Sequence, residues 1–247
     1  MSRWKAAAIH LSISATIGVL TLILLFGVWY PPPYFHAGGA DELVLLLVGV
    51  DLTLGPLLTL VVFRSGKRGL KFDLALIGLM QAAALVYGMN VVLATRPIFL
   101  VAVPDRFVLV SANEITDADL ALGSEERFRS RSWTGPRLVG VEFPTNLQER
   151  NDLVFAAAAG RDIQNQPRYF RDFGQRATTL IAHGKPLEQL RKRSAQADQT
   201  LSQWLASSGH DPASVLWMPL LARSTDLVAL IDAKSGNLLG ALPIEPW

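Results

Sequence analysis

The stretch "VGVDLTLGPLLTLVVF", residues 48–63, is apolar enough to cross a membrane, yet it carries Asp51 and, four residues later, Gly55 and Pro56. An ionised aspartate at the centre of a membrane helix costs about 2.5–3.5 kcal/mol on insertion scales. Pro56 has no backbone N–H, so it cannot donate to the carbonyl of Leu52. Together these residues predict a local polar spot inside an apolar helix, and the surrounding sequence indicates its purpose.

Three apolar runs occupy the first 96 residues, at about 6–30, 43–63 and 74–93. A helix needs about 20 apolar residues to cross a bilayer. In the first run only His10 is titratable. A signal peptide is the alternative, but its apolar region is usually about 7–15 residues and precedes a small-residue cleavage site. This run ends in "VWYPPPYF", whose aromatics suit a membrane interface and whose prolines stop a helix. We therefore favour an uncleaved span.

Small or polar residues recur at helical spacing in each run, a pattern that permits close helix contacts and interhelical hydrogen bonds. The members of these stripes are Ser14, Gly18 and Thr21 in the first run, Asp51, Gly55 and Thr59 in the second, and Gly78, Gln81, Leu85 and Gly88 in the third. We expect the three helices to pack together or to receive a guest helix. Two interpretations of Asp51 stay open: a neutral carboxyl hydrogen-bonded to Gln81 or a serine, or a functional group.

Basic residues separate the two ends of the predicted bundle. Arg3 and Lys5 precede the first run and four Lys/Arg lie in the loop 64–71, whereas the loop 31–42 contains none. The positive-inside rule places the N-terminus and the loop 64–71 in the cytoplasm. Three spans then put residues 97–247 on the far side. We expect a multi-pass protein of a bacterial inner membrane, with a membrane domain of residues 1–96 and a periplasmic domain of residues 97–247.

Residues 97–247 have the composition of an ordinary soluble domain, with sixteen Lys/Arg against seventeen Asp/Glu. This balance does not suggest a nucleic-acid partner. The sequence predicts an α+β domain with a small antiparallel sheet and helices on one face. The expected strands lie at 98–103, 106–111, 135–144 and, as three strands, within 215–244. The expected helices begin at Thr116 or Asp117, at Thr145 and near Lys185, the last two ending at Gly160 and Gly209.

No catalytic signature is present in the sequence. The chain has no cysteine, which excludes disulfides and thiolate metal sites, and it contains no G-x-S-x-G, HExxH or phosphate-binding glycine loop. We expect no enzyme activity, metal or cofactor. Asp105 and Arg106 are expected to form an ion pair at a turn. The stretch "RFRSRS", residues 127–132, suits an acidic partner, although a solvated basic loop is the more ordinary interpretation.

The sequence resembles the TfpX/TfpZ family of type IV pilin accessory proteins and the related FimB fimbrial-biogenesis proteins. The stretches that carry the resemblance are "GVDLTLGPLLTLVVF", "DLALIGLMQAAALVYG", "RPIFLVAVPDRFVLV" and the final "GNLLGALPIEPW". The positions that match the motif are Asp51, Gly55, Pro56, Asp73, Gln81, Tyr87, Gly88, Arg96, Pro97, Asp105, Arg106 and Phe107. The resemblance implies an inner-membrane protein associated with pilin stability and pilus assembly, with no catalytic residues.

This resemblance suggests a purpose for the polar spot, namely docking of the membrane helix of a type IV pilin. The mature pilin begins with an amine and carries a glutamate a few residues later. The expected docking residues are Asp51, Gly55, Pro56, Thr59, Gln81, Tyr87 and Gly88. The expected structural residues are Asp73, Arg96, Pro97, Asp105, Arg106 and Phe107. The alternatives are a proton- or ion-coupled protein that uses Asp51 and a periplasmic ligand sensor, although three spans are few for a transporter and the cytoplasmic segments hold no output domain.

Overall fold

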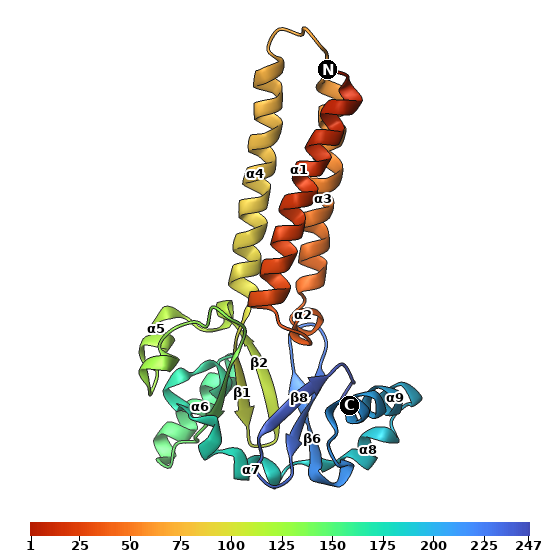
Figure 1. Cartoon of the computed structure of the whole chain (residues 1–247). Helices are drawn as coiled ribbons and strands as arrows, with labels where there is room; N and C mark the ends of the chain where they lie inside the picture. The colour runs from red at the N-terminus through yellow and green to blue at the C-terminus, as the bar shows by residue number, and fades with distance from the viewer.

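The computed structural model describes the backbone of residues 1–247 and every side chain except that of Leu46. Three long helices form a stalk that stands on a curled-sheet domain (Figure 1). They are α1 (Arg3–Leu24), which continues as the π-helical turn Leu25–Trp29, α3 (Ala40–Val62) and α4 (Leu70–Thr95). All three are long and apolar enough to cross a membrane. The predicted combination of three such helices with an α+β domain is confirmed.

Helix α3 packs along both α1 and α4, whereas α1 and α4 make few contacts with each other. The stripe Ser14, Gly18 and Thr21 of α1 is buried, and so are Gly55 and Thr59 of α3. The predicted role of these two stripes as helix contacts is confirmed. The third stripe is only partly right, because Gly78 lies exposed with no other atom near enough to touch an added methyl group. Helix α4 instead buries three residues at other positions, Ile77, Val92 and Thr95.

The ends of α3 and α4 follow from local chemistry. Each helix begins after a glycine with a left-handed backbone, Gly39 with φ 72° and Gly69 with φ 84°. Acidic residues in the first turn of each helix oppose the positive end of the helix dipole. Pro56 lies inside α3, which runs as a helix from Ala40 to Val62. The proline therefore removes a hydrogen bond without ending the helix.

The outer domain contains one eight-stranded sheet with the order β4-β3-β1-β2-β6-β7-β8, and β5 pairs with β6. The strands are β1 (Pro97–Val103), β2 (Arg106–Ser111), β3 (Arg137–Val141), β4 (Phe170–Arg171), β5 (Lys185–Pro186), β6 (Val215–Leu221), β7 (Leu227–Asp232) and β8 (Leu238–Leu242). The prediction of a small antiparallel sheet is wrong, because β1 pairs with β3 and β2 with β6 in parallel. The long connections that precede β3 and β6 give the chain room to return in the same direction.

Helices cover both halves of one face of the sheet, so the prediction that they share a face holds for α5, α6, α8 and α9, whereas α7 packs Leu180 against the opposite face. In Figure 1, α5 and α6 lie beside β1 and β2, α8 and α9 lie beside β6 and β8, and α7 lies at the end away from the stalk. Their bounds, with that of the short α2, are Tyr34–Ala37 (α2), Asp117–Ala121 (α5), Leu147–Ala158 (α6), Ala177–Ile181 (α7), Leu187–Arg191 (α8) and Ala195–Ser208 (α9). Single 3₁₀ turns span Ala112–Glu114, Glu126–Phe128, Ile163–Asn165, Pro167–Tyr169, Phe173–Gln175 and Pro212–Ser214.

Helix caps fix several of these boundaries. The hydroxyl of Thr116 accepts from the backbone N–H of Asp119 at 3.1 Å, which confirms Thr116 as the cap of α5. The single helix predicted from Lys185 to Gly209 is instead two helices. Ser194 interrupts it, because its hydroxyl accepts from the N–H of Ala197 at 3.0 Å and so starts α9.

The curled sheet gives the outer domain three buried clusters. One packs β1 and β3 against α5 and α6, and another packs β6 to β8 against α8 and α9. These two clusters share one face of the sheet, and the third lies on the opposite face, where it includes Phe107 and Met218. Ala37 and Tyr34 from α2 join this third cluster. The connection between α1 and α3 is therefore part of the outer core, and burial raises the pKa of Tyr34 to about 12.

Hydrogen bonds join the stalk to the outer domain. The hydroxyl of the fully buried Tyr30 donates to the carbonyl of Val92 at 3.2 Å, which ties the end of α1 to the end of α4. The N–H of Ala112 donates to the carbonyl of Arg96 at 2.9 Å, and the N–H of Ser224 to that of Ala37 at 2.9 Å. Because both connections pack on the sheet domain, the division at residue 96 stays a prediction.

Candidate functional site

Four residues from three helices form a polar cluster inside the stalk: His10 of α1, Asp51 and Thr59 of α3, and Gln81 of α4. The imidazole of His10 bridges two helices, with Nδ1 at 2.6 Å from Thr59 Oγ1 and Nε2 at 2.6 Å from Gln81 Oε1. Gln81 Nε2 donates to the main-chain carbonyl of Asp51 at 3.2 Å. The cluster therefore links all three helices within the apolar stalk.

The chemistry of the partners sets the direction of these hydrogen bonds. A main-chain carbonyl only accepts, so the amide nitrogen of Gln81 faces Asp51 and its oxygen faces His10. His10 Nε2 therefore carries a hydrogen. In a neutral imidazole Nδ1 is then an acceptor, and the hydroxyl of Thr59 donates to it. The hydrogen bonds run in one direction, from Thr59 through His10 and Gln81 to the carbonyl of Asp51.

Gly55 leaves the space that Gln81 occupies. A methyl group at this position would overlap the nitrogen, oxygen and carbon of the Gln81 amide. Gly49, on the same helix, has no other atom near enough to touch an added methyl group. The requirement for glycine is thus specific to position 55, where it lets the amide reach the backbone of α3.

The carboxyl of Asp51 is not part of the hydrogen-bond chain. Its Oδ1 atom is buried and has no hydrogen-bond partner among the side chains that the structure describes. Asp51 itself keeps part of its surface accessible. Of the two interpretations left open, pairing with Gln81 is found, but through the backbone carbonyl of Asp51 and not through its carboxyl. The three helices thus leave one carboxyl oxygen of Asp51 without a hydrogen bond.

The other predicted docking residues lie outside the cluster. Pro56 is half-buried beside Gly55. Gly88 lies further along α4, where a methyl group would overlap Leu47 of α3, so it is a helix contact. Tyr87 is 74 % exposed and points away from the stalk. The structure thus brings together Asp51, Gly55, Thr59 and Gln81, while Gly88 and Tyr87 lie apart from them.

The sequence analysis did not identify His10 as a residue of the site. Two signals were available there. His10 is the one His, Lys, Arg, Asp or Glu of the first apolar run, and it lies one helical turn before Ser14, so it extends the stripe that continues through Gly18 and Thr21. Neither signal identifies the hydrogen-bond partners of His10, because Thr59 and Gln81 lie on other helices, 49 and 71 residues further along the chain.

The predicted structural residues have local roles. Asp73 pairs with Lys67 at 2.7 Å and so closes the loop before α4. The predicted ion pair between Asp105 and Arg106 is confirmed at 3.1 Å, in the turn between β1 and β2. Phe107 is fully buried in the core of the outer domain. The remaining two, Arg96 and Pro97, lie where α4 passes into β1.

Ionised groups of the outer domain form surface pairs and no reactive centre stands out. Arg176 and then Arg171 hold the pKa of Glu142 below its usual range, and Arg127 does the same for Asp172. Arg127 contacts both Glu125 and Asp172 at 2.8 Å, so this part of the basic stretch 127–132 is ion-paired and not simply solvated. Within the described residues, no group of three or more His, Asp or Glu side chains could hold a metal ion.

Comparison with known proteins gives consistent matches. Residues 1–39 match the family described as fimbrial assembly protein FimB. The chain is 31 % identical to the "Fimbrial assembly protein, serogroup I" of Dichelobacter nodosus over 98 % of this chain and 95 % of that protein. It is 30 % identical to the serogroup E1 protein of the same organism, over the same shares of both chains. No solved structure matches.

The close fit between Gly55 and Gln81 predicts an asymmetry between two glycines of α3. In Gly55→Ala the amide of Gln81 has to move, which breaks its bond to Asp51 and disturbs His10. We expect a loss of about 1–2 kcal/mol in the free energy of unfolding, the range of a buried hydrogen bond in a membrane protein. Thermal unfolding of the purified protein in detergent measures this.

The matched control is Gly49→Ala, which adds the same methyl group to the same helix in open space. It should be neutral or slightly stabilising, because alanine favours helix more than glycine does. Equal loss of stability in both variants would show that Gly55 has no special contact with Gln81.

Proposed function

The chain belongs to the family of fimbrial assembly proteins, and we propose that it serves fimbrial assembly as a membrane protein that binds and stabilises the pilin subunit without catalysis. The observation that carries this proposal is the polar cluster, because its Asp51 carboxyl is a buried acceptor left over after the three helices have paired. A pilin helix is the partner of suitable length and chemistry for such a site.

A membrane location is supported by the three apolar helices, and the distribution of charge supports an orientation. The N-terminus and the basic loop 64–71 lie at the same end of the stalk, and the outer domain lies at the opposite end (Figure 1). By the positive-inside rule the first end is cytoplasmic. The outer domain is then periplasmic and the membrane is the bacterial inner membrane.

Docking would use surfaces that the stalk does not itself fill. Gly78 of α4 is exposed, and another helix can approach closely at such a residue. Asp51 keeps part of its surface accessible, and an amine is the natural partner of its carboxylate. The proposed docking residues remain Asp51, Gly55, Pro56, Thr59, Gln81, Tyr87 and Gly88. Within this set, Gly55, Thr59 and Gln81 act by shaping the cluster.

Proton transfer is a second candidate, because His10 supplies a second titratable group beside Asp51. The hydrogen-bond chain ends, however, at the main-chain carbonyl of Asp51 and not at its carboxyl. A carbonyl oxygen does not release a proton onward, so this arrangement favours a structural chain over a relay. Proton leak in proteoliposomes distinguishes the two functions.

The proposed orientation predicts the outcome of reporter fusions. Alkaline phosphatase is active only outside the cytoplasm, so a fusion after Trp247 should be active and a fusion within residues 64–71 should be inactive. The activity of both fusions, normalised to their amounts, measures this. The reverse pattern would overturn the orientation.

The proposed docking predicts that Asp51→Asn reduces capture of pilin while the accessory protein itself keeps its normal amount. Asparagine is cheaper to bury than ionised aspartate, so insertion should be preserved, but the pairing of charges is lost. Asp51→Leu removes hydrogen bonding as well and should reduce capture at least as much. Co-purification of pilin with the tagged protein, both present in native membranes, measures this; we expect at least a fivefold loss, about 1 kcal/mol.

Asp41→Asn is the matched control, since it makes the same change in the first turn of the same helix, at the surface. It should leave pilin capture unchanged. Normal capture by both Asp51 variants would reject docking at this residue. A fall in the amount of the Asp51→Leu protein alone would instead assign Asp51 to the stability of the bundle.

A further inference from the structure

A basic cavity lies in the outer domain beside the end of α4. It has a volume of about 350 Å³, and its walls include Arg96, Arg129, Arg131, Asp117 and Trp133. We call it the basic rim cavity. Three arginines against one acid give it an excess of positive charge, although the outer domain as a whole has nearly balanced charge.

The basic rim cavity lies at the level where the apolar stalk ends. Arg96 directly follows Thr95, the last residue of α4. On the other side, Gly135 lies so close to Pro31 that an added methyl group would be 2.9 Å from the proline ring. The segment that carries Arg129, Arg131 and Trp133 is therefore held near the exit of both helices. Once the stalk is in a membrane, this is the depth of the lipid headgroups.

Arg96 carries a buried charge without a carboxylate partner. It is 5 % exposed, donates to the carbonyls of Leu93 and Ser132, and lies 4.9 Å from the ring centre of Trp133. Among the described residues no acidic side chain pairs with it. Burial and then the charge of Arg131 lower the pKa of Arg96. A buried cation is costly unless a negative charge compensates it, and none is supplied here by the protein.

The neighbouring arginines are held by the backbone. Arg131 donates to the carbonyls of Ile115 at 2.8 Å and Ala112 at 3.3 Å, and also pairs with the exposed Asp117. Arg129 donates through Nε to the carbonyl of Gly123 at 2.9 Å. Its two terminal nitrogens have no partner among the described residues. Fixed guanidinium groups with free N–H donors are the preferred ligands of phosphate.

Trp133 indicates that the basic rim cavity faces the membrane interface. It is 64 % exposed, although its indole ring is large and apolar. Tryptophan is enriched at the membrane interface, where its ring lies among the headgroups. An exposed tryptophan next to a cluster of arginines, level with the end of a membrane helix, matches a lipid surface better than open water.

We propose that the basic rim cavity binds the phosphate of an anionic phospholipid headgroup, with Arg96, Arg129 and Arg131 around the phosphate and Trp133 beside the glycerol region. The proposal rests on the membrane insertion included in the proposed function, but not on pilin binding. Such a lipid would neutralise the buried charge of Arg96 and hold the outer domain against the membrane.

The test uses the full-length protein in a neutral detergent, with short-chain phosphatidylglycerol, phosphatidylcholine or inorganic phosphate added. Phosphatidylglycerol should raise the midpoint of thermal unfolding by about 3 °C, as expected for a ligand well above its dissociation constant. The other two additions should raise it much less. In Arg129→Gln/Arg131→Gln the rise should disappear, each variant being compared with its own midpoint without lipid.

Arg191→Gln/Arg193→Gln is the matched control, because it removes the same charge near α8, at the other end of the sheet (Figure 1). It should keep the full rise in the midpoint of thermal unfolding.

If the Arg129→Gln/Arg131→Gln variant does not fold, Arg129→Gln alone should show a reduced rise. An unchanged rise in the cavity variants, or an equal rise with phosphatidylcholine, would overturn the proposal. An equal rise with inorganic phosphate would reassign the cavity to a free anion and overturn the lipid assignment. Capture of pilin by the same variants, expected to be normal, separates this result from the proposed function.

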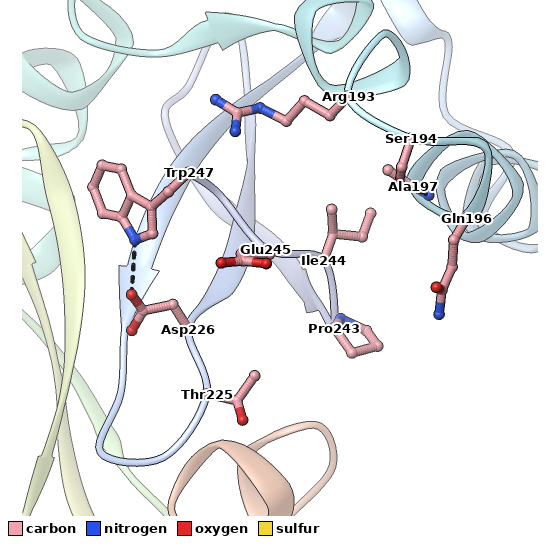
Figure 2. Close-up of a pocket in the computed structure, with 10 residues that line it drawn as sticks. All are labelled: Arg193, Ser194, Gln196, Ala197, Thr225, Asp226, Pro243, Ile244, Glu245 and Trp247. Carbon is pink, nitrogen blue, oxygen red and sulfur yellow. Dashed lines mark hydrogen bonds between the residues drawn. The ribbon is translucent and has the colours of Figure 1, made fainter.

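A second cavity, of about 370 Å³, carries no comparable site. Its walls include Arg193, Asp226, Glu245 and the C-terminal Trp247, so opposite charges already meet there. The indole of Trp247 donates to Asp226 Oδ2 at 2.8 Å (Figure 2). This contact fastens the end of the chain to the turn between β6 and β7.

Discussion

Polar groups inside an apolar helix bundle have to be satisfied by one another, and this constraint shapes the stalk. Each of its three helices brings polar side chains that would be unfavourable in lipid. The chain Thr59–His10–Gln81–Asp51 satisfies three of these residues at once, and it does so only because Gly55 leaves room for the Gln81 amide. The rotation of the helices about their axes follows from it, since only one orientation of each brings these groups within reach.

The same orientation of the three helices determines where their ends meet the outer domain. With α1 and α4 held on α3, Tyr30 bonds to the end of α4, and the chain enters β1 directly after Arg96. The connection from α1 to α3 enters the outer core through Tyr34 and Ala37. Stalk and sheet are thus joined at two separate places. A protein built this way can pass a change in the stalk helices to the outer domain.

The sequence predicted those features that depend on local pattern. Hydrophobic runs predicted the three helices, short β-rich runs predicted β1 and β2, and a capping residue at Thr116 or Asp117 predicted the start of α5. What it did not predict depends on distant pairing. The parallel pairs of the sheet join segments far apart in the chain, and the short β4 and β5 leave almost no signal of their own.

The candidate site shows the same division. Asp51, Gly55, Thr59 and Gln81 were found because each lies on a polar stripe with helical spacing. The sequence did not predict the hydrogen bonds that these residues make. One expectation was a bond between Gln81 and the carboxyl of Asp51, but Gln81 donates to the backbone carbonyl of Asp51. Tyr87 was grouped with the site through sequence similarity to a family motif, and its exposure shows that such a motif does not specify which face of a helix a residue occupies.

The direction of the hydrogen-bond chain is the claim on which this account rests, and nitrogen NMR of His10 tests it directly. The spectra are recorded on the full-length protein in detergent, labelled with ¹⁵N-histidine. The pH is about 8, above the usual histidine pKa of about 6.5, so an ordinary imidazole is neutral. The signals of His10 are identified by their loss in His10→Asn. The account predicts a single tautomer with hydrogen on Nε2 and a hydrogen-bonded acceptor at Nδ1, and the loss of that fixed state in Gln81→Ala. A mixture of exchanging tautomers, or hydrogen on Nδ1, would contradict it.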